Sequence, residues 1–287
     1  MPLYLSESDV AELVSPGIAV DAIEECFRRM AQGEVEIAPR RRLRLPEGAL
    51  ADMAAADSGL GLAGGKLYAS TAAGTTFVVC LFDSGTSELV AVIEADRLGQ
   101  LRTGAASGVA ARFLARGGAR TLGVIGCGSQ AETQVACIRA AVPGIERIVA
   151  YCRTPENLAA FCERTGAEAG ESHRDAASGE VVATITTSRD PVLRGEWLAP
   201  GTLVVAVGAN VVTKRELDSA VLERASFVCC DWLEVHELHE VVAGETSGRQ
   251  SDGEIVVFKS NGLAAWDVAL GAEVVRLARE HGIGTTL

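Results

Sequence analysis

The chain has 287 residues, of which 48% are apolar and 22% are charged, and its formal net charge at pH 7 is −12. This length and composition suit a globular protein of about two domains and exclude a disordered chain. The acidic balance argues against a nucleic-acid or anionic-membrane partner, because both need a basic surface.

The N-terminal residues, MPLYLSESD, contain no basic region followed by an apolar core and are therefore not typical of a signal peptide. No apolar run reaches the length of a membrane span. We therefore expect a cytoplasmic protein without a membrane partner. The eight cysteines include no Cys-x-x-Cys pair. The two histidines in HELH (236–239) lack the spacing of a His-Glu-x-x-His site, so a polar helix face is favoured and no metal is expected.

The first 117 residues mix helices with strands. Ser6 to Asp9 resembles a capping box that opens a helix through about Leu13. The pattern then predicts, in order, a helix over 19–30, strands over 42–45, 65–70, 76–82 and 88–94, and a long helix over 97–115. The DSGT sequence at 83–86 is typical of a hairpin turn between the last two of these strands.

Gly117-Gly118 breaks the long helix and marks a domain boundary. Beyond it, apolar strands are predicted over 121–125, 147–152, 181–186, 203–207 and 227–231, with helices that begin near Ser129, Pro155, Arg174 and Lys214. Such alternation predicts a parallel sheet covered on both faces. A strand over 255–260 and a helix over 264–281 are expected to return to the first domain. The predicted domains are 1–117 with 255–287, and an inserted α/β domain at 118–254.

The stretch TLGVIGCGSQAETQVACIRAA (121–141) contains Gly126-x-Gly128-x-x-Ala131, which fits the Ala-ending form of the Rossmann dinucleotide-binding fingerprint. The first glycine permits a tight turn, the second lets the backbone approach a pyrophosphate, and the small third residue allows close packing of helix and strand. The motif follows an apolar strand and opens a helix, so it indicates a dinucleotide site at which Ser129 and Gln130 also lie, rather than a tight corner alone.

The end of the second strand of this domain discriminates between cofactors. An NAD site usually has an acid there to bind the ribose 2′-hydroxyl, but residues 150–154 read AYCRT. Arg153 could pair with a 2′-phosphate and Thr154 could hydrogen-bond to it. Alternatively, Arg153 merely ends the strand. We expect NADP(H) to be preferred, with NAD(H) possible.

Six segments of the chain resemble the ornithine cyclodeaminase/mu-crystallin family. They are GGKLYAS, LRTGAASGVAARFLA, LGVIGCGSQAE, GEWLAPGTLVVAVGAN, KRELD and VFKSNGLAAWDVA, and they cover almost the whole chain in the expected order. The resemblance implies an α/β Rossmann domain inserted into an α+β substrate and dimerisation domain, with catalysis in the cleft between them, and a homodimer. Activities known in the family are ornithine cyclodeamination, alanine dehydrogenation and ketimine reduction.

The resemblance also implies site residues. The family's substrate-carboxylate arginine falls on Arg40, or on Arg41 if the register slips, its lysine on Lys66, and a second arginine on Arg102. Three cations that face one cleft would hold a small carboxylate. Lys66 by itself could be a solvated lysine, but the two glycines before it and its apolar neighbours favour a site residue. Three further positions follow from the matching segments: Val207 and Gly208 at the cofactor, and Asn261 at the substrate near the nicotinamide.

Two departures from the cyclodeaminase pattern separate this chain from that activity. The aspartate beside the amino carbon falls on Asn210, and the acid in the strand before the lysine falls on Ala51. Asp52 is adjacent, but consecutive strand residues point to opposite faces. A negative charge about 4 Å from an iminium contributes on the order of 4 kcal/mol at an effective dielectric near 20, and an amide cannot supply it.

These residues predict an NADP(H)-dependent imino-acid (ketimine) reductase. Its substrate would be a small carboxylate-bearing imine, or a keto acid with an amine, and its catalytic residues would be Lys66, Arg102 and Asn210. An alanine-type dehydrogenase is the first alternative, and a cyclodeaminase is the next. A non-catalytic NADP-binding protein of the crystallin kind remains the alternative from another class.

Overall fold

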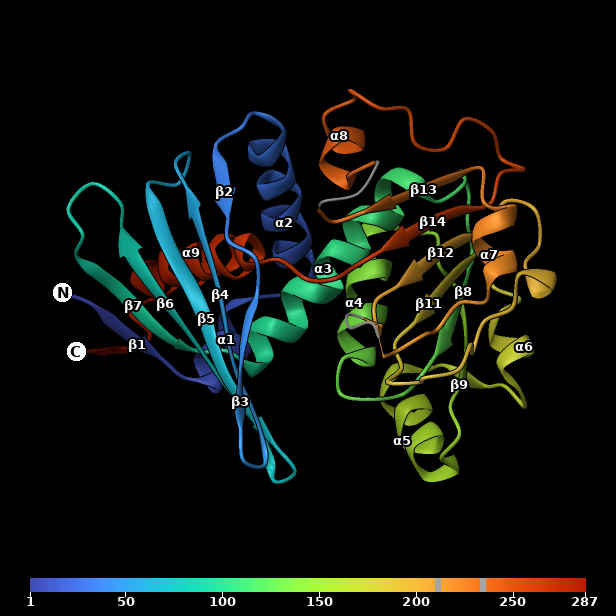
Figure 1. Cartoon of the computed structure of the whole chain (residues 1–287), viewed down its shortest axis with the longest axis horizontal. Coiled ribbons are helices and arrows are strands. Elements are labelled where there is room, and N and C mark those ends of the chain that lie inside the picture. The colour runs from blue at the N-terminus through green and yellow to red at the C-terminus, as the bar shows by residue number, and fades with distance from the viewer. Residues whose placement is uncertain (210–212, 233–235) are drawn as a thin grey trace. The chain divides into compact units, whose positions relative to one another are not determined.

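The computed structural model describes residues 1–209, 213–232 and 236–287, and its contacts divide the chain into two compact units. The first unit comprises Met1–Arg102 and Leu263–Leu287, and the second comprises Thr103–Gly262. Each unit is built on a sheet of its own, labelled in Figure 1.

The sheet of the first unit has the strand order β15-β1-β7-β6-β5-β4-β2, with β3 paired to β4, and most of its pairs are antiparallel. Its strands are β1 (Leu3–Leu5), β2 (Val35–Ile37), β3 (Arg41–Leu45), β4 (Gly48–Asp57), β5 (Leu62–Thr71), β6 (Gly74–Asp83), β7 (Leu89–Glu94) and β15 (Thr285–Thr286). Its helices are α1 (Glu7–Leu13), α2 (Pro16–Ala31), the start of α3 (Asp96–Leu114), and α9 (Ala264–His281). Helix α9 packs on β4, β5 and β6, and α2 packs on α9 (Figure 1), so the core lies between the helices and one sheet face.

The register of the long strands decides which side chains face that core. Lys66 in β5 lies opposite Met53 in β4 and Val79 in β6, both of which are buried. The next residue, Leu67, points to the other face of the sheet and is 45% exposed. Lys66 is therefore placed on the inner face, beneath α9.

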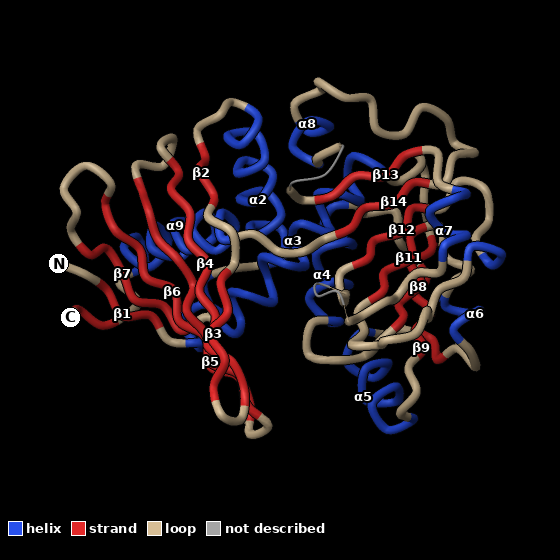
Figure 2. Tube along the Cα trace, in the orientation of Figure 1, coloured by secondary structure: helices blue, strands red, loops and turns tan. Residues whose placement is uncertain are grey.

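The second unit contains a parallel sheet in the order β10-β9-β8-β11-β12-β14-β13. Its strands are β8 (Thr121–Ile125), β9 (Arg147–Tyr151), β10 (Glu168–Ala169), β11 (Val181–Thr184), β12 (Leu203–Ala206), β13 (Phe227–Cys230) and β14 (Val256–Lys259). Its helices are α4 (Ala131–Ala141), α5 (Pro155–Thr165), α6 (His173–Ala176), α7 (Ser219–Arg224) and α8 (Leu238–Val242), which alternate with strands through most of the unit (Figure 2). The strand order reverses between β8 and β11, and ligands of such sheets bind at this switch point.

Most of the predicted elements are confirmed. Ser6 caps α1 in a capping box with Asp9, and the turn at 83–86 joins β6 to β7 as an antiparallel hairpin. The predicted strands of the second unit match β8, β9, β11, β12 and β13 to within two residues at either end. The ten-residue strand β4 was not predicted, because its alanine-rich sequence carries little strand signal.

The prediction that residues 255–260 return to the first domain is wrong. Strand β14 pairs in parallel with β12 on one side and β13 on the other. Val256, Val257 and Phe258 are fully buried, as expected for a strand inside a covered parallel sheet. The chain returns to the first unit at Leu263, with α9.

The predicted boundary at Gly117-Gly118 also differs from the division in the structure, which falls inside α3 after Arg102. A Cβ added to Gly104 would lie 2.5 Å from the carbonyl oxygen of Thr133, so α3 packs directly on the backbone of α4. This close packing joins the rest of α3 to the second unit.

The helix predicted near Lys214 begins instead at Ser219, as α7. Asp218 is its N-cap, and the carboxylate accepts a hydrogen bond of 3.0 Å from the amide of Val221. A helix can begin here because this side chain satisfies an amide that has no partner within the helix.

Within the described parts of the chain, no helix has both the length and the apolar character needed to cross a bilayer. Among the same residues, no three His, Cys, Asp or Glu side chains are grouped to hold a metal ion. His239 of the HELH stretch lies 3.1 Å from Glu237, in an ordinary side-chain pair.

Candidate functional site

The glycine turn joins β8 to α4 at the switch point of the parallel sheet. Gly126 has φ +106°, and a Cβ there would lie 2.3 Å from the carbonyl oxygen of Ile185, so this position requires glycine. Gly128 is exposed, and a Cβ on it would meet no atom within 4 Å. Ser129 beside it is also exposed, and Gln130 makes no side-chain cap to α4, which begins at the buried Ala131. The open space at Gly128 and the uncapped helix start fit a dinucleotide pyrophosphate.

The end of β9 presents a cation and no carboxylate within residues 151–154. Arg153 and Thr154 are both exposed, and Thr154 is the N-cap of α5 without a side-chain cap bond. Burial, with the nearby Arg153 charge, lowers the pKa of His173, whose ring lies 4.7 Å from that of Tyr151. Arg153 and Thr154 therefore have the exposure that a ligand on this side of the turn would need.

One buried acid joins the loops that follow β11 and β12. Glu216 is 2% exposed and accepts hydrogen bonds from the amides of Thr186, at 2.6 Å, and Gly208, at 2.7 Å. Burial raises the pKa of this carboxyl, while the hydrogen bonds act in the opposite direction. Val207 and Gly208, predicted at the cofactor, thus lie in a loop that Glu216 fixes. Glu216 was not predicted from the sequence, although the acid in KRELD was the available signal.

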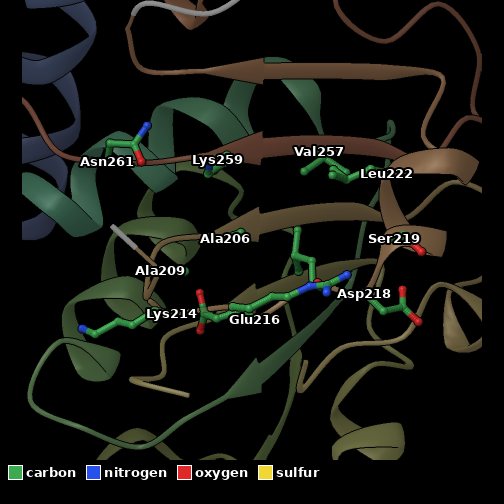
Figure 3. Close-up of a pocket in the computed structure, with 12 residues that line it drawn as sticks. Ala206, Ala209, Lys214, Glu216, Asp218, Ser219, Leu222, Val257, Lys259 and Asn261 are labelled. Carbon is green, nitrogen blue, oxygen red and sulfur yellow. The ribbon is translucent and has the colours of Figure 1, made fainter. Parts of the chain in front are cut away.

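Asn261 follows β14 in the second unit, whereas the basic residues with which it was grouped as substrate-binding lie in the first. The backbone N–H of Asn261 donates a hydrogen bond of 2.6 Å to Oδ2 of the buried Asp231. Asn261 also lines a pocket of about 460 Å³, where it lies with Lys214 and Ala209 at one end (Figure 3). Asn210, the other predicted amide, lies outside the described residues.

A buried ionic cluster lies in the first unit beneath α9. Asp267 Oδ1 accepts a hydrogen bond of 2.9 Å from Lys66 Nζ and one of 3.1 Å from Arg102 Nε. The three side chains are 0%, 3% and 8% exposed, respectively. Lys66 comes from the middle of β5, Arg102 from α3 and Asp267 from the first turn of α9, where a carboxylate is favoured by the helix dipole.

The two candidate arginines at 40 and 41 have different environments. Arg40 is half-buried and its Nε donates to Met53 Sδ at 3.2 Å, on the face that carries Lys66. Burial lowers the pKa of Arg40, and the charge of Arg102 also lowers it. The Arg41 side chain is 79% exposed and pairs with Asp52 at 2.8 Å. Arg40 therefore belongs with the cluster, and Arg41 does not.

The cluster has a marked effect on its lysine. Burial, followed by the charge of Arg102, lowers the pKa of Lys66 to about 8, and Asp267 acts against this shift. The Nζ atom also lies 5.9 Å from the centroid of the Phe77 ring. A lysine with this pKa can donate a proton near neutral pH.

Asp267 was not singled out from the sequence. The available signal was one acid inside the apolar stretch GLAAWDVALG, in which residues 263–271 are all buried. A carboxylate in such a helix needs a cationic or hydrogen-bonding partner, because burying an unpaired charge is very costly.

The glycine turn and the parallel sheet define a Rossmann-type dinucleotide-binding protein. Its relatives are dehydrogenases and reductases, and the protein is an NAD(P)H-dependent oxidoreductase. It belongs to the ornithine cyclodeaminase/mu-crystallin family, whose sequence profile matches residues 2–281.

Two relatives extend over nearly the whole chain. Alanine dehydrogenase of Archaeoglobus fulgidus is 34% identical over 99% of this chain and 98% of its own. Iminosuccinate reductase of Paracoccus denitrificans is 30% identical over 98% of each chain.

Solved structures agree with this assignment. An archaeal alanine dehydrogenase dimer with bound NAD has a TM-score of 0.93 at 32% identity, over 100% of this chain and 98% of that one. Thermococcus litoralis Δ1-pyrroline-2-carboxylate reductase, in complex with NADH and L-proline, has a TM-score of 0.91 at 27% identity. The match covers 99% of this chain and 100% of that one. The P. denitrificans iminosuccinate reductase with NAD+ has a TM-score of 0.90 at 29% identity, and the match covers 99% of this chain and 98% of that one.

Proposed function

We propose that this protein is an NADP(H)-dependent imino-acid (ketimine) reductase that converts a small 2-imino carboxylate to a 2-amino acid. The observation that carries the proposal is the buried cluster of Lys66, Arg102 and Asp267, with the half-buried Arg40 on the same sheet face. Two guanidinium groups and an ammonium group gathered on one sheet face would bind a substrate carboxylate. Relatives named as iminosuccinate reductase and Δ1-pyrroline-2-carboxylate reductase support this substrate class.

The proposed roles are taken for each unit separately. NADP(H), held at the glycine turn of Gly126 and Gly128, would supply a hydride for the carbon of the C=N bond. In the first unit, Arg102 and Arg40 hold and orient the carboxylate, since guanidinium groups bind carboxylates through paired donors. Lys66 donates the proton that the imine nitrogen gains, so that one hydride and one proton complete the amine. In the second unit, Glu216 keeps the loops after β11 and β12 together at the carboxyl ends of the strands.

The alternative with a specific observation in its favour is an alanine-type dehydrogenase, because the A. fulgidus enzyme of that name is 34% identical. It would use the same hydride chemistry with ammonia as a co-substrate or product. Cyclodeamination is disfavoured by Ala51, which is 1% exposed and faces Tyr68 across the strand pair. The neighbouring Asp52 is paired with Arg41 instead.

Activity measurements on a set of substrates test the proposal. We expect NADPH oxidation with cyclic ketimines such as pyrroline-2-carboxylate, or with a keto acid supplied together with ammonia or methylamine. The same keto acids without an amine are the control and should give no oxidation. Because position 51 carries no acid, ornithine with NAD or NADP should yield neither proline nor ammonia. Proline formation from ornithine would contradict the proposal, and activity confined to alanine and pyruvate would favour the dehydrogenase.

NADP(H) is the proposed preferred cofactor because an exposed arginine and no acid end β9. We expect NADPH to bind at least about tenfold more tightly than NADH, since one charge-assisted contact to a phosphate contributes roughly 1.5–3 kcal/mol. Arg153→Ala should remove this preference, whereas Arg147→Ala, at the opposite end of β9, should keep it. Fluorescence titration of both cofactors measures the ratio, and equal affinities in the unmodified protein would refute the preference.

We also propose that the protein forms a homodimer. Leu43, Leu67 and Phe82 are 62%, 45% and 42% exposed. The strand register places all three on the face of the first unit's sheet opposite Lys66. Exposed apolar side chains that share one face are typical of an interface, and the archaeal alanine dehydrogenase structure is a dimer.

A further inference from the structure

We propose that Asp267 is a positioning residue of the active site, which holds the Lys66 ammonium and the Arg102 guanidinium side by side for proton donation and carboxylate binding. The inference deepens the proposed function and rests on it for the roles of these two cations. The geometry behind it is a single carboxylate oxygen that accepts from both side chains, at 2.9 and 3.1 Å.

The shared oxygen joins groups that are distant in sequence. Asp267 is 201 residues from Lys66 and 165 from Arg102, so the arrangement depends on α9 returning to the sheet of the first unit. Arg102 donates to Asp267 through Nε, so its two terminal nitrogens would be the donors to a planar anion. Its guanidinium also lies 5.7 Å from the Trp266 ring, which limits its rotation.

A comparison with a second buried aspartate shows that Asp267 differs from an ordinary structural acid. Asp231 is also 0% exposed, but its Oδ2 accepts from the amides of Asn261 and Gly262 and from the hydroxyl of Ser260. Asp267 Oδ1 instead accepts from two side-chain cations, and in both aspartates the other carboxylate oxygen is buried without a hydrogen-bond partner among the described residues, so the donors are what differ. The Asp267 carboxylate therefore binds two cationic side chains, whereas that of Asp231 binds the backbone of a turn.

The charges that face Lys66 come from three places. Arg102 in α3 and Arg40 before β3 disfavour its proton, and Asp267 in α9 favours it. Tyr68, two residues further along the same strand face, interacts with Arg40. Among these charged groups, Asp267 is the anion, so its removal would leave Lys66 beside two arginines. We expect Lys66 to lose its proton at a lower pH in that case.

The chain offers a direct measurement, because it contains three lysines: Lys66, Lys214 and Lys259. Protein labelled with ¹³C at lysine Cε should give three titrating signals, and Lys66→Arg identifies the first. In Asp267→Asn, we expect the midpoint of the Lys66 signal to fall by about one to three pH units, the range that a close opposite charge produces. The Lys214 and Lys259 signals should not move and serve as internal controls. Asparagine has nearly the same side-chain shape as aspartate, and its amide nitrogen can take the place of the unpartnered Oδ2 of Asp267.

Kinetics then connect the charge to the reaction. In Asp267→Asn, the alkaline limb of the plot of kcat/KM against pH should move to lower pH together with the NMR midpoint of Lys66. In Asp267→Glu, which keeps a carboxylate, this shift should be smaller. If Asp267→Asn does not fold, Asp267→Glu tests the same contact, because the longer side chain moves the carboxylate and the Lys66 midpoint should then fall by a smaller amount. An unchanged Lys66 midpoint in a folded variant overturns the proposal. The NMR result does not need turnover, so a failure of the proposed reductase activity is distinguished from a failure of this inference.

Discussion

Arg102→Ala is expected to lower kcat/KM for the imino acid by about 10- to 100-fold while NADPH binding is retained. The lost contact is charge-assisted and buried, and such a contact to a carboxylate contributes roughly 1.5–3 kcal/mol, with 1.36 kcal/mol for each factor of ten. Arg102 is part of the buried ionic cluster of the first unit, whereas the glycine turn belongs to the second. Steady-state kinetics and a separate NADPH titration measure the two effects independently.

Lys66→Ala should lower kcat/KM by at least as much as Arg102→Ala does. The fall should be mainly in kcat, because the variant lacks the proposed proton donor. Arg41→Ala provides a matched control: this arginine neighbours Arg40 in sequence, but its side chain is 79% exposed and paired with Asp52. Its kinetics should equal those of the unmodified protein, since exposed ion pairs contribute little. A loss of NADPH affinity in the Arg102 or Lys66 variant, or normal turnover in either, would show that the roles are misassigned.

The second large effect is expected at the glycine turn, where Gly126→Ala should lower the thermal stability and Gly128→Ala should weaken NADPH binding. At Gly126 a methyl group would approach the carbonyl oxygen of Ile185 to 2.3 Å, at φ +106°. The backbone strain by itself costs about 1–3 kcal/mol, so we expect Tm to fall by several degrees. At Gly128 the added methyl group meets no protein atom within 4 Å, so Tm should not change.

Gly128→Ala should instead weaken NADPH binding by about tenfold or more, because the methyl group would occupy the space that a pyrophosphate needs to approach the backbone. Thermal unfolding of both variants, followed by NADPH titration of each folded protein, separates the two effects. Unaltered NADPH affinity in Gly128→Ala would mean that the turn is a strand-to-helix corner without a cofactor role.

The local elements and the family could be predicted from the amino-acid sequence. The capping box at Ser6, the hairpin at 83–86 and the strand before Gly126 could be predicted because propensity, capping and alternation act over a few residues. The glycine turn was predictable for the same reason, since its geometry depends on the glycines themselves. The cations at Arg40, Lys66 and Arg102 came from the family resemblance and not from any local pattern.

The tertiary structure decided what depends on partners far away in the chain. An apolar run such as 255–260 fits any covered parallel strand, and only its pairing with β12 and β13 assigned it to the second unit. The register of β3 and β4 placed Arg41 against Asp52 and separated it from Arg40. Asp267 meets Lys66 because α9 returns to the first unit's sheet. A buried charge requires a partner, but the sequence does not name that partner, because the contact forms only when residues about two hundred positions apart are brought together by the fold.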